Sequence, residues 1–269
     1  MDDLRGRVAL VTGANHGIGA ATAELLARRG AAVLLSYRRV EDPDDPGTPA
    51  QYREARAADA AGVVERITSA GGRADAAEAD LADEAAAESL FARAEKTFGP
   101  VEILVNNASG WTADTFRGDG PDRLGRRIRQ LSAATFDQVF AVDARGAALL
   151  IAGFARRHIA RGGDWGRIVG LTSGGPLGFP EEVSYGAAKA AQENLTMSAA
   201  FELAGHGVTA NVVHPPVTDT GWVTEAVRTA VAESPEHVHV ATAGEVAAVI
   251  GWLVSDEARL VTANVIRLR

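Results

Sequence analysis

The sequence has no cysteine, and this absence excludes several chemistries at once. A disulfide scaffold, a thiolate metal site and a thiol nucleophile all need cysteine. Aromatic residues are also scarce, at 6% of the 269 residues, while 46% of the chain is hydrophobic, which is enough to bury one large core. Positive charge is in deficit as well. The net charge of −8 argues against nucleic acid or an anionic membrane surface as a partner.

No segment predicts export or membrane insertion. A signal peptide begins with cations, whereas this chain begins with Asp2 and Asp3, and Gly13 interrupts its first apolar run. The longest apolar stretch elsewhere, Ala144–Ala155, contains Arg145 and is too short to span a bilayer. We therefore expect a soluble, cytoplasmic protein.

Short apolar runs alternate with segments of helical periodicity along the chain. The runs predict buried parallel strands at Val8–Val11, Val33–Ser36, Ile103–Val105, Arg167–Leu171, Thr209–Val213 and Val265–Leu268. Helices are expected at Ile18–Arg29, Ala85–Thr97 and Tyr185–Ala204. This alternation predicts an α/β fold with a three-layer, doubly wound parallel sheet of the Rossmann type, in one domain that covers residues 1–269.

Two segments interrupt the alternation and are expected to be loop insertions. The first, near residues 40–50, is acidic and rich in proline, which predicts a surface loop. The second, near residues 111–132, is long for a connection inside a compact domain. It holds the arginines Arg117, Arg123, Arg126, Arg127 and Arg129. Solvated side chains and contacts to an anionic substrate both remain open for these arginines.

A glycine-rich turn follows the first expected strand and precedes the first expected helix. Its glycines are spaced Gly-x-x-x-Gly-x-Gly. Glycines let the backbone approach a pyrophosphate closely, and the start of a helix offers free N–H groups and the positive end of its dipole. A tight turn without a ligand is the alternative, because the spacing differs from Gly-x-Gly-x-x-Gly. The residues expected to bind a dinucleotide here are Thr12, Gly13, Asn15, His16, Gly17, Ile18 and Gly19.

Further motifs follow this turn in a fixed order. They are Asp80-Leu81, Asn106-Asn107-Ala108-Ser109-Gly110, Ser173, Tyr185-x-x-x-Lys189, and Pro215 with Thr220. In their order and approximate spacing they resemble the motifs of the short-chain dehydrogenase/reductase family, in its short single-domain branch, over nearly the whole chain. The resemblance implies a Rossmann-like fold, a nicotinamide cofactor and hydride transfer between that cofactor and a carbonyl or alcohol carbon.

The end of the second expected strand bears on which nicotinamide cofactor is used. An acid there would bind both ribose hydroxyls and repel a 2′-phosphate, but the position holds Tyr37. Arg38 and Arg39 follow, and a guanidinium can pair with a phosphate dianion. We therefore expect NADP(H) to be preferred over NAD(H), with His16 adding positive charge only in part at neutral pH. In the alternative, the two arginines are surface charges that balance Glu41, Asp42, Asp44 and Asp45.

The resemblance also implies contacts to the adenosine half of the cofactor. Asp80, followed by Leu81, resembles the family acid that contacts the adenine amino group, although a helix N-cap is a competing explanation for it. Asn107 and Ala108 are implied to line the adenosine ribose. Ser109 stands where the family usually has glycine.

A later segment resembles the family turn that holds the nicotinamide carboxamide through backbone groups. Pro215 begins it, and Thr218 and Thr220 are candidate donors to the cofactor. Pro216 replaces the usual glycine, so a loop that needs a positive φ must differ here. Residues 221–242 are expected to form a substrate lid, with Trp222 and Val223 as apolar contacts.

The predicted catalytic groups centre on a tyrosine and a lysine four residues apart on one helix face. A neighbouring ammonium favours a phenolate, so we expect Lys189 to lower the pKa of Tyr185. Tyr185 would then exchange a proton with the substrate oxygen as hydride moves. Ser173 would donate a hydrogen bond to that oxygen, with Thr172 as the alternative by strict counting.

A fourth position departs from the family pattern. The family has an asparagine that holds a water between the lysine and solvent, and Asp143 stands at that place. A carboxylate accepts the same bonds but adds charge near Lys189 and cannot donate when ionised. We expect a working proton relay through Asp143, and loss of activity is the alternative.

Together the motifs imply an NADPH-dependent carbonyl reductase, running as an alcohol dehydrogenase in reverse, for a small-molecule ketone or secondary alcohol. It resembles the ketoreductases of acyl-carrier-protein thioesters, polyketides and small ketones. A homodimer or homotetramer is expected by analogy. No metal is expected, because His237 and His239 have no third ligand at a suitable spacing.

Two other functions stay open. A non-catalytic NADP(H) sensor would bind cofactor but would need none of Ser173, Tyr185 and Lys189. A sugar-nucleotide epimerase or dehydratase would share the Tyr-x-x-x-Lys pair, but such chains are generally longer and carry a C-terminal nucleotide domain.

Overall fold

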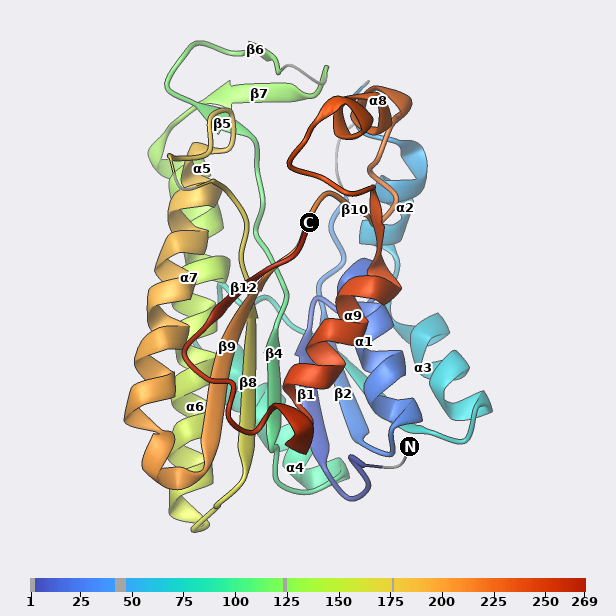
Figure 1. Ribbon diagram of the computed structural model, residues 1–269, viewed down its shortest axis with the longest axis vertical. Coiled ribbons are helices and arrows are strands. Elements are labelled where there is room, and N and C mark those ends of the chain that lie inside the picture. The colour runs from blue at the N-terminus through green and yellow to red at the C-terminus, as the bar shows by residue number, and fades with distance from the viewer. Residues whose placement is uncertain (1–2, 42–46, 123–124, 176) are drawn as a thin grey trace.

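A seven-stranded parallel sheet forms the centre of the molecule (Figure 1). The computed structural model describes residues 3–41, 47–122, 125–175 and 177–269. The strand order is β12-β9-β8-β4-β1-β2-β3. The strands span β1 Val8–Thr12, β2 Ala32–Tyr37, β3 Arg73–Glu78, β4 Ile103–Asn106, β8 Gly166–Leu171, β9 Val208–His214 and β12 Val265–Arg267. The order reverses between β1 and β4, and ligands of such sheets bind beyond the carboxyl ends of the strands at this reversal.

Six of these strands lie where apolar runs predict them, and none of their ends differs by more than one residue. The runs are continuous because β1, β4 and β8 are buried along their whole length, as in other parallel sheets covered on both faces. Sequence analysis missed β3, the edge strand. Its residues are alanines and charged side chains, all exposed or half-buried, so it has no β-branched or aromatic signal.

Helices cover both faces of the sheet and complete the three layers (Figure 1). One layer contains α1 Gly17–Arg28, α3 Ala61–Ser69 and α9 Ala243–Leu253, and the other contains α4 Ala86–Thr97, α6 Ala147–Ala160 and α7 Val183–Glu202. A hydrophobic core lies on each face of the sheet, and successive residues of β2 pack into opposite cores: Val33 and Leu35 into one, Leu34 into the other. The predicted three-layer, doubly wound α/β fold is confirmed, and the three predicted helices differ by at most two residues at each end.

The helix that leads into α6 contains a wider turn. α5 Ala133–Val139 continues through the π-helical segment Phe140–Gly146 into α6. Asp143 lies in this segment and is fully buried, and π-helical turns often occur at functional sites. By length and composition alone the run Ala133–Ala160 could cross a membrane. In the fold it supplies Leu150 and Phe154 to the core beneath the sheet.

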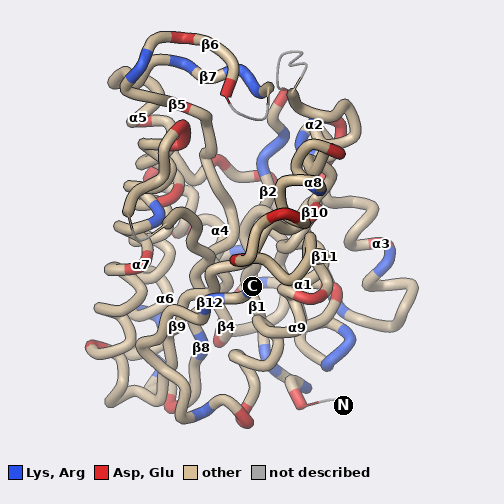
Figure 2. The backbone as a smooth tube through the Cα atoms, turned by 45° about the horizontal axis from the view of Figure 1, so that its top comes forward, with Lys and Arg blue, Asp and Glu red and all other residues tan. Residues whose placement is uncertain are grey.

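The inserted segments gather beyond the carboxyl ends of the strands (Figure 1). The first contains α2 Ala50–Ala57, and the second forms a small sheet of β5 Asp114–Thr115, β6 Gly120–Pro121 and β7 Arg127–Gln130. The two insertions touch, because a Cβ atom on Gly47 would lie 2.5 Å from the backbone of Arg126. Figure 2 shows basic residues on both sides of this end, along β7 and beside α2.

The segment after β9 completes this end of the molecule. It contains β10 Thr218–Asp219, α8 Glu225–Glu233 and β11 Ala241–Thr242, and β10 pairs with β11. Short 3₁₀ turns at Ala204–His206 and Asp256–Ala258 lie at the opposite end of the sheet.

Candidate active site

The glycine-rich turn after β1 is compact because its glycines lie against other backbone. A Cβ atom on Gly19 would lie 2.2 Å from the carbonyl oxygen of Gly13, and Gly13 itself has a φ of +62°. Gly17 has a φ of +57°, and a Cβ atom there would lie 2.8 Å from the methyl group of Thr220. Any other side chain would force these parts apart. The close packing of the turn places the N-terminus of α1, with its free N–H groups, at the cavity.

Thr12 and Asn107 fasten this turn to the end of β4. The Asn107 Nδ2 atom donates to the carbonyl oxygens of Thr12 and Gly13 at 2.8 and 2.9 Å. The Thr12 hydroxyl accepts from the backbone N–H groups of Asn107 and Ala108, both at 3.0 Å, and donates to Val105. The polar groups of Thr12 are thus used inside the protein, although sequence analysis places it among the cofactor ligands.

His16 precedes α1 and faces the inserted helix α2. Its ring contacts the ring of Tyr52 edge-on, with centroids 5.8 Å apart. Burial, together with the nearby charge of Arg56, lowers the pKa of His16 to about 4. The imidazole is therefore neutral at pH 7 and does not supply the positive charge that a basic residue at this position would give.

Arg38 and Arg39 leave the end of β2 and form different ion pairs. Arg38 lies 3.1 Å from a carboxylate oxygen of Asp80, and both side chains are largely exposed. Arg39 pairs with Glu78 at 2.7 Å. The other oxygen of Asp80 accepts from the backbone N–H of Ala82 at 2.9 Å, so Asp80 also stabilises the local turn. Of the acids expected as alternative partners, Asp42, Asp44 and Asp45 lie outside the described residues.

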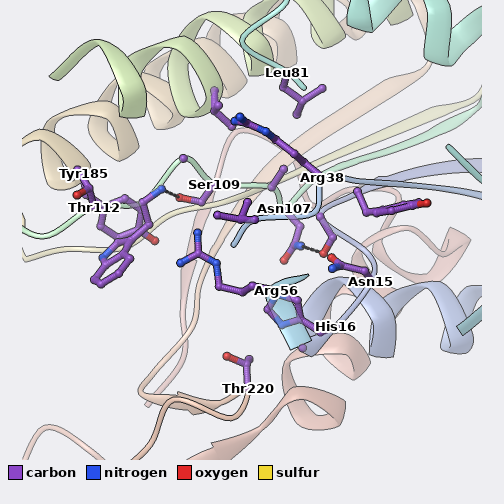
Figure 3. A pocket seen from close by; sticks show the side chains of 18 of the residues that line it. Asn15, His16, Arg38, Arg56, Leu81, Asn107, Ser109, Thr112, Tyr185 and Thr220 are labelled. Atoms are coloured by element: carbon purple, nitrogen blue, oxygen red, sulfur yellow. Dashed lines mark hydrogen bonds between the residues drawn. The ribbon is translucent and has the colours of Figure 1, made fainter. Parts of the chain in front are cut away.

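One cavity of about 780 Å³ brings most of the predicted site together (Figure 3). The predicted residues that line it are Gly13, Asn15, His16, Gly17, Ile18, Arg38, Arg39, Asp80, Leu81, Asn107, Ala108, Ser109, Ser173, Tyr185, Lys189, Pro215 and Thr220. Four predicted residues do not line it: Thr12, Gly19, Asp143 and Thr218. Gly19 shapes the turn from behind, and the Thr218 hydroxyl donates to the carbonyl oxygen of Pro216 at 2.8 Å.

Ser173 lies just after the end of β8 and Tyr185 lies in the first turn of α7, and both line the cavity. Burial raises the pKa of Tyr185 well above its ordinary value, and the negative charges of Asp143 and Glu182 raise it further, while the neighbouring Ser173 hydroxyl lowers it. The expectation that Lys189 acidifies Tyr185 is therefore wrong for this structure. The phenol is therefore neutral at pH 7.

Lys189 points to Asp143 instead. Its Nζ atom lies 2.9 Å from the Asp143 carboxylate and donates to Gln192 Oε1 at 3.0 Å, but it is 5.5 Å from the centre of the Tyr185 ring. Both partners of the ion pair are buried, with Lys189 2% and Asp143 0% exposed. The second oxygen of Asp143 accepts from Gly110 N at 2.7 Å and from the Ser109 hydroxyl at 3.2 Å. Asp143 thus links Lys189 to the Asn-Asn-Ala-Ser segment.

The structure separates the two candidates for the hydrogen-bond donor. The Thr172 hydroxyl donates to Glu193 Oε1 at 2.7 Å. Ser173, in contrast, influences the pKa of Tyr185. The geometry therefore favours Ser173 as the group beside the reacting oxygen.

The segment after β9 departs from the expected contacts. None of the residues 215–220 has a positive φ, which agrees with proline at position 216. Neither Trp222 nor Val223 lines the cavity. The indole N–H of Trp222 donates to Thr218 O at 2.9 Å, and its ring packs near the Arg126 guanidinium at 5.9 Å. Both expected apolar contacts to substrate are therefore absent from this arrangement.

Of the described arginines of the second insertion, Arg117 and Arg126 form ion pairs, and Arg127 and Arg129 line the cavity. Arg123 lies outside the described residues. Arg126 is mostly buried and pairs with Asp122 at 2.6 Å and Glu182 at 2.7 Å, so it is not solvated. Arg117, which is exposed, pairs with Glu181. Arg127 and Arg129 line the cavity.

Sequence analysis missed several residues that line the cavity. Tyr52, Arg53 and Arg56 come from α2, and Trp111 and Thr112 begin the second insertion. Helix α2 has no buried residue and therefore no apolar stripe that would reveal it. Proline followed by good helix formers (Pro49, then Ala50-Gln51) was the available signal.

No cluster of three or more His, Cys, Asp or Glu within the described ranges is placed to hold a metal ion. His239 instead lies 2.9 Å from Glu245. A dinucleotide suits the cavity better. The glycine-rich turn lines the cavity, helix α1 begins at this turn, and Arg38 follows the end of β2.

Comparisons with known proteins show the family of the chain. The family described as "Enoyl-(Acyl carrier protein) reductase" matches residues 13–268. A "Short-chain type dehydrogenase/reductase" of Picea abies is 34% identical over 273 residues, covering 98% of this chain and 92% of that protein. A "NADPH-dependent aldehyde reductase-like protein, chloroplastic" of Arabidopsis thaliana is 35% identical over 271 residues, covering 98% and 93%.

A solved structure is also similar along its full length. The short-chain dehydrogenase from Burkholderia cenocepacia J2315 in complex with NADP superimposes with a TM-score of 0.79 at 30% identity, covering 99% of this chain and 97% of that one. These similarities, and the nicotinamide chemistry that they share, make the protein an NAD(P)-dependent oxidoreductase with a small-molecule substrate. The chain belongs to the short-chain dehydrogenase/reductase family.

Proposed function

We propose that this oxidoreductase is an NADPH-dependent carbonyl reductase that runs as an alcohol dehydrogenase in reverse. The observation that carries the proposal is one cavity that joins the glycine-rich turn to the pair Ser173 and Tyr185. A dinucleotide laid along the turn would extend toward this pair. A carbonyl oxygen that meets both hydroxyl groups would be positioned for reduction.

The protein's part in the reaction follows from the state of these groups. Nicotinamide supplies the hydride when it is bound. Ser173 donates a hydrogen bond to the substrate oxygen and fixes its position, where it stabilises developing negative charge. Tyr185, which is protonated at neutral pH, gives up its proton to the same oxygen. Lys189, held by Asp143, places a positive charge behind the ring.

A second cavity suggests where the rest of the substrate lies. It has a volume of about 880 Å³ and meets the first cavity at Ser173. Phe116, Leu177 and Phe179 line it, and Phe116 and Leu177 are 78% and 99% exposed. We infer that an apolar substituent of the ketone occupies this cavity, with the carbonyl turned toward Ser173.

The preference for NADPH rests on charge at the end of β2. Tyr37 cannot repel a 2′-phosphate as an acid would, and Arg38 lines the cavity beside it. The Arabidopsis relative is named as NADPH-dependent, and the Burkholderia structure contains NADP. The expected homodimer or homotetramer stays a prediction.

The test is a panel of ketones and acyl thioesters, with NADPH oxidation followed by absorbance in the wild type and in Tyr185→Phe. Phenylalanine keeps the ring and removes the proton, so turnover should fall by about 10²–10⁴-fold while the Kd of NADPH stays unchanged. Equal turnover by the two proteins would remove Tyr185 from the proton step. Tight NADPH binding with no turnover of any carbonyl by the wild type would favour the non-catalytic sensor.

A further inference from the structure

The inserted helix α2 lies against the glycine-rich turn. The Asn15 Nδ2 atom, in the turn, donates to the carbonyl oxygens of Ala55 and Ala58 at 3.2 and 2.9 Å. Nearer the start of α2, Tyr52 contacts the ring of His16 edge-on. Two separate contacts therefore fasten this helix to the residues that lead into α1.

The same helix also meets the segment after β9. A Cβ atom on Gly221 would lie 3.6 Å from Tyr52 Cα, an ordinary packing distance. Thr220, the preceding residue, lies against Gly17 of the turn. The turn, α2 and Thr220 thus enclose one end of the cavity from three sides.

Arg56 projects from α2 into this enclosure. Figure 3 shows its side chain between Asn107 and Thr220, with the guanidinium toward the middle of the cavity. The residue is half-buried, and its Cζ atom lies 5.7 Å from the centre of the Tyr52 ring. Arg38 lies elsewhere in the cavity, next to Leu81 in the same view, and pairs with Asp80.

We propose that Arg56 binds the pyrophosphate of the dinucleotide, so that the inserted helix contributes a cation opposite the glycine-rich turn. The proposal rests on the cofactor assigned under Proposed function. The turn and the start of α1 bind a pyrophosphate through N–H groups from one side, and a guanidinium can pair with it bidentately from the other. His16, the one ionisable side chain of the turn, is neutral at pH 7 and leaves this role open.

The proposal separates the roles of two arginines. The pyrophosphate is common to NADH and NADPH, whereas only NADPH carries a 2′-phosphate. Arg56 therefore strengthens the binding of both cofactors, and Arg38 strengthens that of NADPH alone. The effects on the two Kd values therefore show whether Arg56 binds the pyrophosphate or is a second residue that binds the 2′-phosphate.

The experiment measures the Kd of NADPH and of NADH by nicotinamide fluorescence in four proteins. They are the wild type, Arg56→Gln, Arg38→Gln and the control Arg66→Gln. Arg66 is an exposed arginine of α3 that pairs with Glu24 and does not line the cavity. Arg56→Gln should raise both Kd values by about tenfold or more, the loss of one charge-assisted hydrogen bond. Arg38→Gln should raise that of NADPH only, and Arg66→Gln neither.

Three results would overturn the proposal. Arg56→Gln could leave both Kd values unchanged, it could raise that of NADPH alone, or Arg66→Gln could weaken binding equally. A wild type that binds neither cofactor would instead overturn the proposed function. Arg56→Lys keeps the charge and loses the bidentate geometry, so an intermediate Kd in a protein of unchanged melting temperature separates phosphate binding from a folding defect.

Discussion

The two sides of the active-site cavity are built in different ways. On the side of the predicted catalytic groups, Tyr185 and Asp143 lie on α7 and the π-helical segment, and Ser173 follows the end of β8 by two residues. On the other side, the inserted elements α2 and β5–β7 bring arginines to the cavity. The first side depends on the sheet and its helices, whereas the second is held by side-chain contacts between segments far apart in the sequence. The predicted catalytic groups and the arginines of the insertions therefore come from separate parts of the chain.

The largest effect is expected where the insertion is joined to the catalytic helix. Arg126, Asp122 and Glu182 have side chains only 14%, 0% and 10% exposed, and they pair with one another. Arg126→Gln would remove the cation that the buried carboxylates of Asp122 and Glu182 share. The free energy of unfolding should fall by about 3–5 kcal/mol, as measured by urea denaturation at neutral pH.

Arg117→Gln is the matched control for this variant. Arg117 lies in the same insertion and pairs with Glu181, but its side chain is 69% exposed, so its loss should cost less than about 1 kcal/mol. Similar losses in the two variants would show that the insertion is not held by the buried ion pairs. The comparison between the two sides would then fail.

The next effect tests the catalytic side. Ser173→Ala removes the hydroxyl beside Tyr185, and kcat for carbonyl reduction should fall by about 10²–10³-fold. Thr172→Val removes the neighbouring hydroxyl, which is bonded to Glu193, and should change kcat far less. Steady-state kinetics at saturating NADPH provides the measurement. If Thr172→Val caused the larger loss, the hydrogen-bond donor would be Thr172.

Sequence analysis predicts the regular side of the molecule well. Buried strands leave continuous apolar runs, so β1, β4 and β8 are found within one residue. The turn and Ser173, Tyr185 and Lys189 are found because their order and spacing resemble the motifs of the short-chain dehydrogenase/reductase family. These features are local, and a local pattern is what a single sequence carries.

The remaining features depend on contacts across long separations. Helix α2 has no buried residue, so its sequence pattern does not indicate that Asn15 donates a hydrogen bond to it or that Arg56 lines the cavity. The direction of the Tyr185 pKa shift was predicted wrongly for the same reason. Spacing places Lys189 one turn away, but only the fold shows that its Nζ atom faces Asp143.

The smallest effect concerns Asp143, which acts as a positioning residue. Its charge raises the pKa of Tyr185, second only to burial among the causes, so Asp143→Asn should lower that pKa. Alcohol oxidation needs the deprotonated phenol, and its rate rises as pH increases through this pKa. The rising limb of the oxidation profile should therefore move to lower pH, and oxidation at a fixed, mildly alkaline pH should become several-fold faster. Carbonyl reduction needs the protonated phenol, so its rate in Asp143→Asn should begin to fall at a lower pH than in the wild type.

The measurement is the pH profile of kcat for alcohol oxidation and for carbonyl reduction. Asparagine keeps the size of the side chain and can still accept from Gly110 N, so a merely structural role would leave the profile in place. Asp143→Ala removes those bonds as well and serves as the control for lost positioning. It should reduce kcat at every pH, and its oxidation limb should move in the same direction as that of Asp143→Asn. If the rising limb of the oxidation profile keeps its pH in both variants, or moves to higher pH, the charge of Asp143 does not raise the pKa of Tyr185. The ion pair with Lys189 would then serve the fold alone.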